Sequence, residues 1–478
     1  MAEKDGKQNR FFKNIEENEA LLKQVFEGDD IFIQRRLRTK DMGRCFIAYF
    51  DGMVNAEIIN LHIVTPVQAM EKLEPLSYFL EKVISTEQAE IEENPEKAFI
   101  AMEMGDTLVF ADGCAAALVC STKGYKTRSV EEPDIEKYLR GPKEGFTESL
   151  MVNTTLIRRK LLSPNLKIET YNPVEHTGER FALVYLSDVV DSEILANIRK
   201  KVENLLLPSF LSSNHLEERI CPKWQLFKTV GMTEKPDIAA AKILEGRVAI
   251  ICEGSPNVLT APFIFMEYFQ TGSDYYGNFW FGSIQRMLRI TGTFLSVSIP
   301  AVYISLVCFH QEMLPTELLV SISASREGVP LSTVFEAFLM LIAFELLREA
   351  GIMMPKGIGD ALSTVGGVVI GQAAVDARFI SAPLVIMIAF TGLTELLIPK
   401  LKGPVFIMRL YLLILSSFVG IYGYLIGVLS ILALLVSKDS FGLPYTAYLD
   451  EISLENMKDT LVRAPMWMLR TRSVRQKE

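Results

Sequence analysis

Residues 290–309 read ITGTFLSVSIPAVYISLVCF, twenty consecutive positions without Asp, Glu, Lys, Arg or His. A helix rises about 1.5 Å per residue, so this stretch is as long as the hydrocarbon core of a bilayer is thick, about 30 Å. It predicts a membrane-spanning helix, and it divides the chain of 478 residues into two kinds of sequence. Asp, Glu, Lys and Arg make up about 27% of residues 1–288 but only about 11% of residues 289–437. We therefore expect a soluble front and a membrane-embedded back.

Further apolar segments follow the first one. They cover residues 331–347, 358–375, 380–398 and 406–437. The last is too long for one upright pass, and it fits either a tilted helix or a tight hairpin. Arg286 and Arg289 lie among aromatic residues before the first span, and a basic tail follows the last one. The positive-inside rule therefore puts both flanks in the cytoplasm and predicts an even number of crossings.

The front half alternates short β-type runs with helical patterns. Strands are predicted at 44–52, 105–121, 165–172, 180–188 and 245–255, and the second run forms a hairpin that turns at Asp112-Gly113. Helices are predicted at 147–163, 191–206, 237–244 and, with an interruption near Gly28, at 15–38. The alternation is typical of an α/β or α+β fold. No internal repeat is evident.

The fold prediction is a cytoplasmic α/β (α+β) part of two subdomains followed by an all-α polytopic membrane domain. The predicted boundaries are 1–43 for an N-terminal helical or flexible segment, 44–145 and 146–285 for the two subdomains, 286–437 for the transmembrane domain and 438–478 for a cytoplasmic tail. GPKEGF at 141–146 is the expected joint between the subdomains. The first residues contain no apolar signal sequence, so we expect the front half to stay inside the cell.

Composition and motifs exclude several function classes. A net charge of -9 and a pI near 5.3 argue against a nucleic-acid partner. We find no phosphate-binding loop, dinucleotide fingerprint, zinc-protease motif or nucleophile elbow, so no catalytic residue, cofactor or metal site is predicted and an enzyme is not expected. EGSPNV at 253–258 is interpreted as a strand ending in a turn, and His310 as an interfacial or capping residue. The six cysteines lack metal-ligand spacing and are expected to be buried in a reducing compartment.

The segment 358–376 carries two stripes at helical spacing. A small-residue ribbon allows close approach of another backbone in lipid, and it consists of Gly359, Ser363, Gly367 and Gly371. The second stripe lies on the other side of the helix and consists of Val365, Val368, Val369, Gln372 and Asp376. In an oligomer, this stripe could line a shared axis, where a valine ring blocks ions by dewetting. The alternative is a tightly packed helix inside one subunit with no pore. A second ribbon suggests that small residues are general packing devices here, and it consists of Ser416, Gly420, Gly423 and Gly427.

Glu336, Glu345 and Glu395 are acidic residues within the apolar segments. Glu336 and Glu345 are nine positions apart and lie on opposite faces of their predicted helix, so lipid cannot surround both. At least one must meet protein, water or an ion. Glu345 could instead lie near the interface with Arg348, and Glu395 could cap the end of its span.

The chain resembles the A subunit of the GerA-type spore germinant receptors over about residues 40–475. The resemblance rests on GPKEGFTESLMVNTTLIRRKLLSPNL (141–166), the block 230–276, FHQEMLPTELLVSISASREGVP (309–330) and VVIGQAAVDA (368–377). Small departures from the family pattern occur at Glu253, Asn257 and Arg378. The family has no catalytic set, so these blocks imply interfaces and folding rather than chemistry.

The resemblance implies a multi-pass protein of the spore inner membrane with its N-terminal domain in the cytoplasm. It implies a complex with a transporter-like B subunit that binds the nutrient and a lipoprotein C subunit. It further implies a homo-oligomeric ion channel that releases monovalent cations early in germination. A non-conducting scaffold of the receptor complex is the alternative, and a transporter is a third hypothesis that lacks the expected hydropathy repeat.

Overall fold

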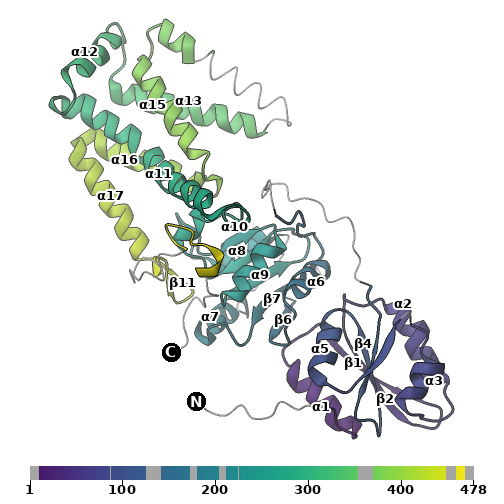
Figure 1. The fold of residues 1–478 in the computed structure, drawn as a ribbon. Helices are drawn as coiled ribbons and strands as arrows, with labels where there is room; N and C mark the ends of the chain where they lie inside the picture. Colours follow the sequence, from purple (N-terminus) through teal and green to yellow (C-terminus); the bar gives the residue numbers. More distant parts are fainter. Residues whose placement is uncertain are drawn as a thin grey trace. The chain divides into compact units, whose positions relative to one another are not determined.

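The computed structural model describes most of the chain, which forms two compact units. One unit contains residues up to Phe263 together with Ser440–Leu443, and the other contains Ile264–Asp439 together with Pro444–Leu469 (Figure 1). The described residues are 10–86, 88–124, 141–172, 180–203, 212–223, 225–353, 369, 371–447 and 459–468.

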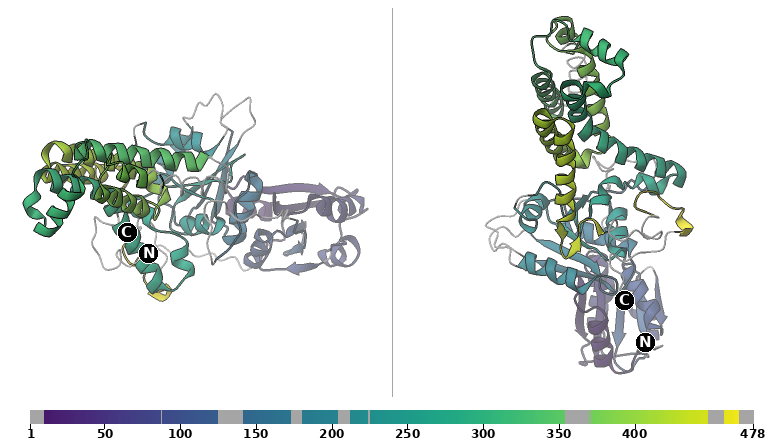
Figure 2. Two further views of the ribbon diagram at one scale, coloured as in Figure 1. Left: turned by 90° about the horizontal axis from the view of Figure 1, so that it is seen from above. Right: turned by 90° about the vertical axis from the view of Figure 1, so that its left-hand side faces the viewer.

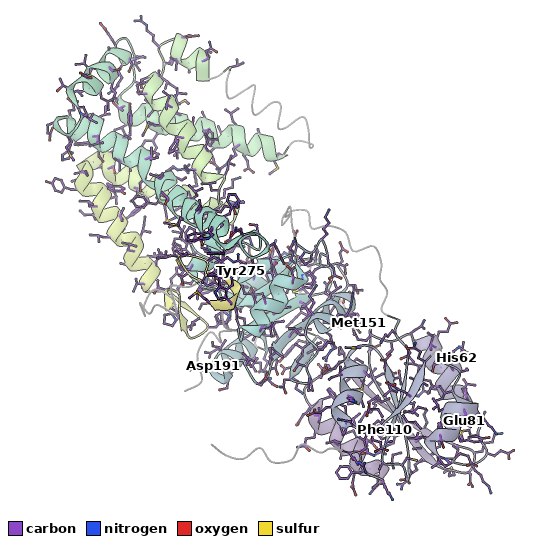
Figure 3. All side chains as sticks on the ribbon, viewed as in Figure 1. His62, Glu81, Phe110, Met151, Asp191 and Tyr275 are labelled. Atoms are coloured by element: carbon purple, nitrogen blue, oxygen red, sulfur yellow. The ribbon has the colours of Figure 1, made fainter. Side chains whose placement is uncertain are left out.

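The first half of the N-terminal unit is an antiparallel sheet with helices on both faces. The strand order is β1-β2-β4-β5-β3. The strands are β1 (Phe32–Arg38), β2 (Arg44–Phe50), β3 (Ala89–Glu92), β4 (Thr107–Ala111) and β5 (Ala117–Cys120). Because side chains alternate along β2, Phe46 and Phe50 face α1 (Ile15–Val25) and α5 (Pro95–Glu103), while Ile47 faces the other layer. That layer consists of α2 (Ala56–Ile59), η1 (Asn60–Val64), α3 (Thr65–Ala69), α4 (Leu76–Tyr78) and η2 (Phe79–Val83). Phe110, labelled in Figure 3, stacks on Phe46 in this core with ring centroids 4.5 Å apart.

The second half of the N-terminal unit has the same architecture. Its sheet is again antiparallel, in the order β6-β7-β9-β10-β8. The strands are β6 (Leu166–Tyr171), β7 (Phe181–Leu186), β8 (Gly231–Thr233), β9 (Val248–Cys252) and β10 (Val258–Ala261). One face packs on α6 (Leu150–Lys160) and α9 (Pro236–Leu244), and the other on α7 (Ser192–Glu203) and α8 (Ser213–Ile220).

The two halves are therefore a structural repeat, which the sequence did not reveal to us. The strand order matches strand for strand, and the likeness extends to single residues. Buried Asn18 accepts a hydrogen bond from the Phe12 N–H and donates one to the Phe12 carbonyl; Asn153 makes the same pair of bonds with Thr147. The Gly113 and Gly254 N–H groups, both after a central strand, likewise donate to equivalent carbonyls before α1 and α6.

The predicted strands at 44–52, 105–121, 165–172, 180–188 and 245–255 are confirmed, and so is the hairpin across Asp112-Gly113. All the described strand pairs are antiparallel, which favours α+β over α/β. The prediction of a helix over residues 15–38 is wrong in its second half. Residues 32–38 form β1. Gly28, at φ +77°, does not allow the helical backbone to continue. Pairing with β2 supplies the backbone hydrogen bonds of residues 32–38 instead.

The other unit is helical. Its elements are η3 (Phe265–Phe269), α10 (Ser273–Tyr276), α11 (Phe279–Ile304), η4 (Ser305–Phe309), η5 (Gln311–Met313), α12 (Thr316–Ser325), α13 (Thr333–Met353), α15 (Ala382–Glu395), η6 (Pro399–Leu401), α16 (Lys402–Val419), α17 (Ile421–Val436) and η7 (Met466–Met468). Helices α11, α16 and α17 pack side by side (Figure 2). Within the described residues, the segments Phe279–Phe309 and Pro399–Val419 are long and apolar enough to cross a membrane, and Ala382–Glu395 and Ile421–Val436 are shorter apolar helices.

The long apolar run 406–437 is a tight hairpin, which decides between the two alternatives left open above. Gly420 separates α16 from α17 at φ +66°, a conformation that other residues rarely adopt. The Tyr411 hydroxyl on α16 lies 2.9 Å from the Ser430 hydroxyl on α17. A side chain at Gly423 would overlap the Leu415 carbonyl, so this ribbon of small residues does bring the two helices together.

After α17 the chain returns to the N-terminal unit. A small pair of strands, β11 (Asp439–Ser440) and β12 (Leu443–Pro444), lies at this point. The Ser440 hydroxyl donates to the Thr229 carbonyl at 2.9 Å and accepts from the Phe263 N–H at 3.1 Å. The Asn197 amide donates to the Phe441 carbonyl at 3.2 Å. The residues that precede and follow the helical unit are therefore hydrogen-bonded to the same subdomain.

Candidate functional site

A network of buried charges connects four helices of the helical unit. Glu395, the last residue of α15, accepts hydrogen bonds from Arg409 on α16, at 2.6 Å, and from Arg348 on α13. Arg348 also pairs with Glu345 one turn earlier on α13. Arg409 donates through Nε and Nη2 to the backbone carbonyl and hydroxyl of Ser296 on α11, at 2.9 and 2.7 Å. We call these five residues the Glu395 network.

The charges of the network are balanced, and its central pair is shielded from the surroundings, while Arg348 and Glu345 are partly exposed. The side chains of Arg409 and Glu395 are 1% and 3% exposed, and the two arginines offset the two glutamates. Such charges in an apolar setting are costly unless each is paired and hydrogen-bonded. The sequence suggests that Glu345 lies near the membrane interface together with Arg348, and the structure pairs these two side chains. Glu395 does end its helix, but as the shared acceptor of two arginines rather than as a simple cap. Arg348 and Arg409 were missed as its partners because they are separated from it by 47 and 14 residues.

Glu336 occupies a different place in the helical unit. It lies on α13 with no exposed surface, and one carboxylate oxygen accepts hydrogen bonds from the N–H and the hydroxyl of Ser381, which precedes α15. The hydroxyl bond is 2.6 Å long. Glu336 and Glu345 therefore have separate partners, and both acidic groups meet protein.

Only part of the helix with the two stripes belongs to the described residues. Gly359, Ser363, Val365, Gly367 and Val368 lie outside them. Residues 371–376 are helical, and Gly371 is buried against Val385 of α15, so this member of the ribbon packs within its own chain. Val369 is 58% exposed, and Gln372 and Asp376 are exposed as well. Within one chain, the described part of the second stripe is open to its surroundings.

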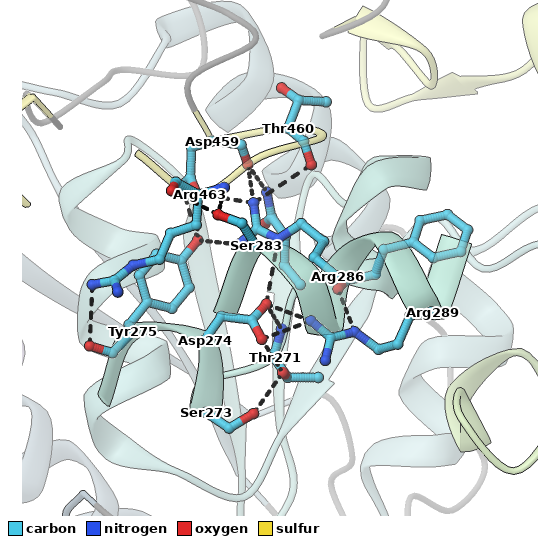
Figure 4. Close-up of polar contacts among 12 residues, drawn as sticks. Thr271, Ser273, Asp274, Tyr275, Ser283, Arg286, Arg289, Asp459, Thr460 and Arg463 are labelled. Atoms are coloured by element: carbon cyan, nitrogen blue, oxygen red, sulfur yellow. Dashed lines mark hydrogen bonds and ion pairs between the residues drawn. The ribbon is translucent and has the colours of Figure 1, made fainter. Parts of the chain in front are cut away.

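The start of α11 holds another charged cluster, here called the Asp274 hub (Figure 4). Buried Asp274 accepts two hydrogen bonds from Arg289, at 2.5 and 2.7 Å, and one from Arg286 at 3.3 Å. Arg286 also donates to the carbonyl and carboxylate of Asp459, at 2.6 and 3.1 Å. The sequence predicts that Arg286 and Arg289 lie at the cytoplasmic surface of a bilayer. The structure adds that both side chains are buried and paired with aspartates.

The N-terminal unit contains a buried charged cluster where its two halves meet. Arg158 of α6 pairs with Asp29, which follows α1, and its guanidinium lies 4.1 Å from the centre of the Phe50 ring. Glu103, at the end of α5, is fully buried and neither carboxylate oxygen has a hydrogen-bond partner. Burial raises the pKa of Glu103 to about 7; Arg158 opposes this rise and Asp29 adds to it. Met151 of α6, labelled in Figure 3, fills the space left by the missing side chain of Gly52.

In the part of the chain that the structure describes, no group of three or more His, Cys, Asp or Glu residues could hold a metal ion. The His310 ring packs edge-on against Tyr422 with centroids 5.9 Å apart, next to the α16–α17 turn. Among the cysteines, Cys45, Cys120 and Cys252 are buried as predicted, but Cys308 is exposed.

The fold and these sites define a class: a duplicated α+β unit joined to a helical unit of membrane-type composition with internally neutralised charges. Comparison with known proteins specifies the family. The model of the Bacillus/Clostridium GerA spore germination protein family matches residues 20–474. The chain belongs to the GerA spore germination family.

Individual relatives are similar along nearly the whole chain. Spore germination protein KA of Bacillus subtilis (strain 168) is 37% identical over 462 residues, which cover 95% of this chain and 84% of that protein. The uncharacterized membrane protein YfkQ of the same organism is 34% identical over 465 residues, 96% of this chain and 90% of the relative. A crystal structure of the N-terminal domain of the A subunit of the Bacillus megaterium spore germinant receptor GerK3 matches 54% of this chain and 98% of its own, at 23% identity and a TM-score of 0.44.

Proposed function

We propose that this chain is the membrane subunit of a nutrient-sensing spore germinant receptor and that several copies surround an ion pore. Membership of the GerA family supports a role in germination. The pore opens when a partner subunit binds nutrient, and it then releases monovalent cations. The partners are a transporter-like B subunit, a lipoprotein C subunit and further copies of this chain. The proposed location is the spore inner membrane, with several crossings and the N-terminal unit in the cytoplasm.

The observation that carries the proposal is the exposure of Val369, Gln372 and Asp376 on one short helical stretch. In a bilayer, an exposed carboxylate and amide facing lipid would be unfavourable, so these groups are expected to meet water or another copy. A valine beside them presents an apolar constriction that water leaves readily. Gly371 on the opposite side packs on α15, which fixes the direction in which the stripe points.

The Glu395 network is the proposed support of this pore-lining segment. It ties α11, α13, α15 and α16 to one another through charge-assisted hydrogen bonds, and α15 is the helix on which Gly371 rests. A stiff frame of this kind would allow a shift that begins elsewhere in the receptor to reach the pore as a movement of the whole bundle. The N-terminal unit is proposed to act as oligomerisation ring and signal relay.

The test is a cation flux measurement on the purified chain in liposomes, with and without the partner subunits. Val369→Ala lowers the cost of wetting the constriction, so basal efflux of monovalent cations should rise several-fold and spores should germinate more readily without nutrient. Val320→Ala is the matched control, because Val320 is 62% exposed but lies on α12. Equal flux from the two variants, both at the wild-type level, would place the gate elsewhere.

A non-conducting scaffold is the alternative function. It is favoured by the pairing within the Glu395 network, because these charges neutralise one another and offer an ion no path through a single chain. A scaffold predicts that no combination of this chain with its partners conducts, while variants of the chain still alter assembly of the receptor. Failure of every reconstituted combination to pass cations, with assembly intact, would support it.

A further inference from the structure

The buried carboxylate of Glu336 is only half satisfied by its own chain. One carboxylate oxygen, Oε1, accepts hydrogen bonds from the N–H and the hydroxyl of Ser381, and neither residue has any exposed surface. The other oxygen, Oε2, is buried and has no hydrogen-bond partner. Buried polar atoms of proteins almost always have a partner, so this oxygen lacks a contact that the chain itself does not supply.

A second buried oxygen without a partner lies nearby. Tyr303, in the last turn of α11, is 7% exposed, and its hydroxyl makes no hydrogen bond. Its side chain packs in the same apolar cluster as Ala337 and Ile380, the chain neighbours of Glu336 and Ser381. The charge of Glu336 acts on the Tyr303 hydroxyl, and Ser381 lies close to it without the geometry of a hydrogen bond. Two unpartnered oxygens, from α11 and α13, are therefore neighbours in an apolar surrounding.

The contacts of Glu336 favour an ionised carboxylate. Its Oε1 accepts from an N–H and an O–H group, and hydrogen bonds of this kind stabilise negative charge. Ser381 is the residue directly before α15, so the carboxylate lies at the N-terminus of that helix, where the helix dipole favours an anion. An ionised Glu336 carries a full negative charge in an apolar setting, which is costly without a counter-charge.

The side chains around Glu336 do not provide that counter-charge. Within the described parts of the chain, Glu336 forms no ion pair, and Arg348 and Arg409 are both taken by Glu395. The charge of Arg326, directly after α12, reaches Tyr303, but this side chain is partly exposed and does not pair with Glu336. The missing positive charge must therefore come from outside the described chain.

We propose that Glu336, Tyr303 and Ser381 form a binding site for one monovalent cation inside the helical unit. Oε2 of Glu336 supplies the charge, and the hydroxyl oxygens of Tyr303 and Ser381 have free lone pairs that replace part of the hydration shell of Na⁺ or K⁺. One carboxylate balances one positive charge, whereas a divalent ion would leave a charge without compensation. The bound cation joins α11 to α13 and to the start of α15. The site lies within a single chain, so it does not depend on the proposed pore.

The experiment measures binding of radioactive cations to the purified full-length chain in detergent. The probes are sodium and rubidium, the latter as a substitute for potassium, in equilibrium dialysis with N-methylglucamine chloride to keep the ionic strength constant. We expect saturable binding of one cation per chain for at least one of the two ions. The same cation should raise the melting temperature of the chain, because it binds the folded state.

Two variants test the proposed ligands. Glu336→Gln keeps the size of the side chain and its bonds to Ser381 but removes the charge, so binding should weaken about ten-fold or more. Its melting temperature should no longer change with the cation, which shows the loss in a chain that still folds. Tyr303→Phe removes one neutral ligand and should weaken binding about three- to ten-fold.

Matched controls remove the same groups from exposed positions. They are Glu317→Gln on α12 and Tyr422→Phe on α17, and both should bind the cation as wild type does. Arg326→Gln should bind at least as tightly as wild type, because it removes a nearby positive charge.

Three results would overturn the proposal. Equal binding by wild type and Glu336→Gln would place the cation elsewhere. Binding that appears only in Arg326→Gln would assign the counter-charge to Arg326. A wild-type chain whose stability depends on pH through Glu336 but on neither cation would hold a proton there instead. Binding in detergent requires no ion flow, so its outcome is separate from that of the flux measurement on the pore.

Discussion

At the level of single residues, Glu395 shows how a charge is tolerated among apolar helices. Its two carboxylate oxygens face two arginines from different helices, and one of these arginines is also held by the backbone of a third helix. The arrangement is stable only as a set, because removing one partner leaves the others buried without compensation.

Removing the negative charge of Glu395 should therefore be more harmful than removing the whole ion pair. We expect Glu395→Gln to destabilise the helical unit by about 3 kcal/mol or more, whereas Glu395→Leu combined with Arg409→Met should recover most of the loss, since an apolar pair of similar volume replaces a costly charged one. Thermal unfolding of the detergent-solubilised chain measures both. Glu317→Gln, at an exposed position on α12, is the control and should have little effect. Identical unfolding of Glu395→Gln and this control would show that the network contributes nothing to stability.

At the level of elements, glycine positions decide where helices end and how closely they pack. Gly420 ends α16 because its backbone is left-handed, and a side chain there would lie 2.8 Å from the Phe309 Cβ. Gly403, in the first turn of α16, faces open space. The same residue type therefore has opposite consequences at the two ends of one helix.

Alanine at these two glycines should shift stability in opposite directions. Gly420→Ala should destabilise the chain by about 1–3 kcal/mol, from the left-handed backbone together with the overlap with Phe309. Gly403→Ala should stabilise it by up to about 1 kcal/mol, because alanine restricts the unfolded chain and favours the helix. Paired melting curves in the same detergent compare the two. A Gly420→Ala chain as stable as wild type would indicate that the α16–α17 turn relaxes without cost.

Elements with a strong local pattern could be predicted, and those set by distant partners could not. The strands that end in Asp-Gly or Glu-Gly were identified because alternation and turn residues lie within one short window. Residues 32–38 were assigned to a helix, since FIQRRLR has both helical and alternating apolar spacing and only β2 decides between them. The sequence identifies acidic members of the Glu395 network but not which groups pair. A charge in an apolar context marks such a residue, whereas nothing in the local sequence specifies its partner.

At the level of the whole molecule, the N-terminal unit uses one pattern twice. Asn18 and Asn153 are 135 residues apart, whereas Gly105 and Gly246, both at positive φ before equivalent strands, are 141 apart. The spacing of equivalent residues thus changes along the chain, and the two copies share mainly glycine, proline and asparagine positions. For these two reasons the duplication is not evident in the sequence. The two copies meet at the buried cluster of Asp29, Glu103 and Arg158. This cluster is not part of the pattern that the two copies share.

Glu103 should make the stability of this junction depend on pH. Its pKa is raised from 4.5 to about 7 by burial, so between these values the folded chain holds a proton that the unfolded chain has released. The contribution of the neutral Glu103 carboxyl to the free energy of unfolding is complete below about pH 4.5 and is lost as the pH rises through about 7. Glu103→Gln keeps a neutral side chain and should be more stable than wild type at pH 8 by about 2–3 kcal/mol, with the difference vanishing near pH 4.5.

Melting temperatures of the two chains across this pH range give the difference directly. Glu81→Gln, at an exposed position on η2, serves as the control and should track wild type at every pH. A difference between Glu103→Gln and wild type that stays constant from pH 5 to pH 8 would rule out ionisation of Glu103 as its cause.

The return of the chain to Thr229 and Phe263 after α17 has a mechanical consequence. A helical unit attached by one flexible segment could swivel, and its attachment would transmit only tension. Here the incoming and outgoing segments are hydrogen-bonded to one another and to the same subdomain through Ser440. A pull on either connection is therefore shared with the other through these hydrogen bonds.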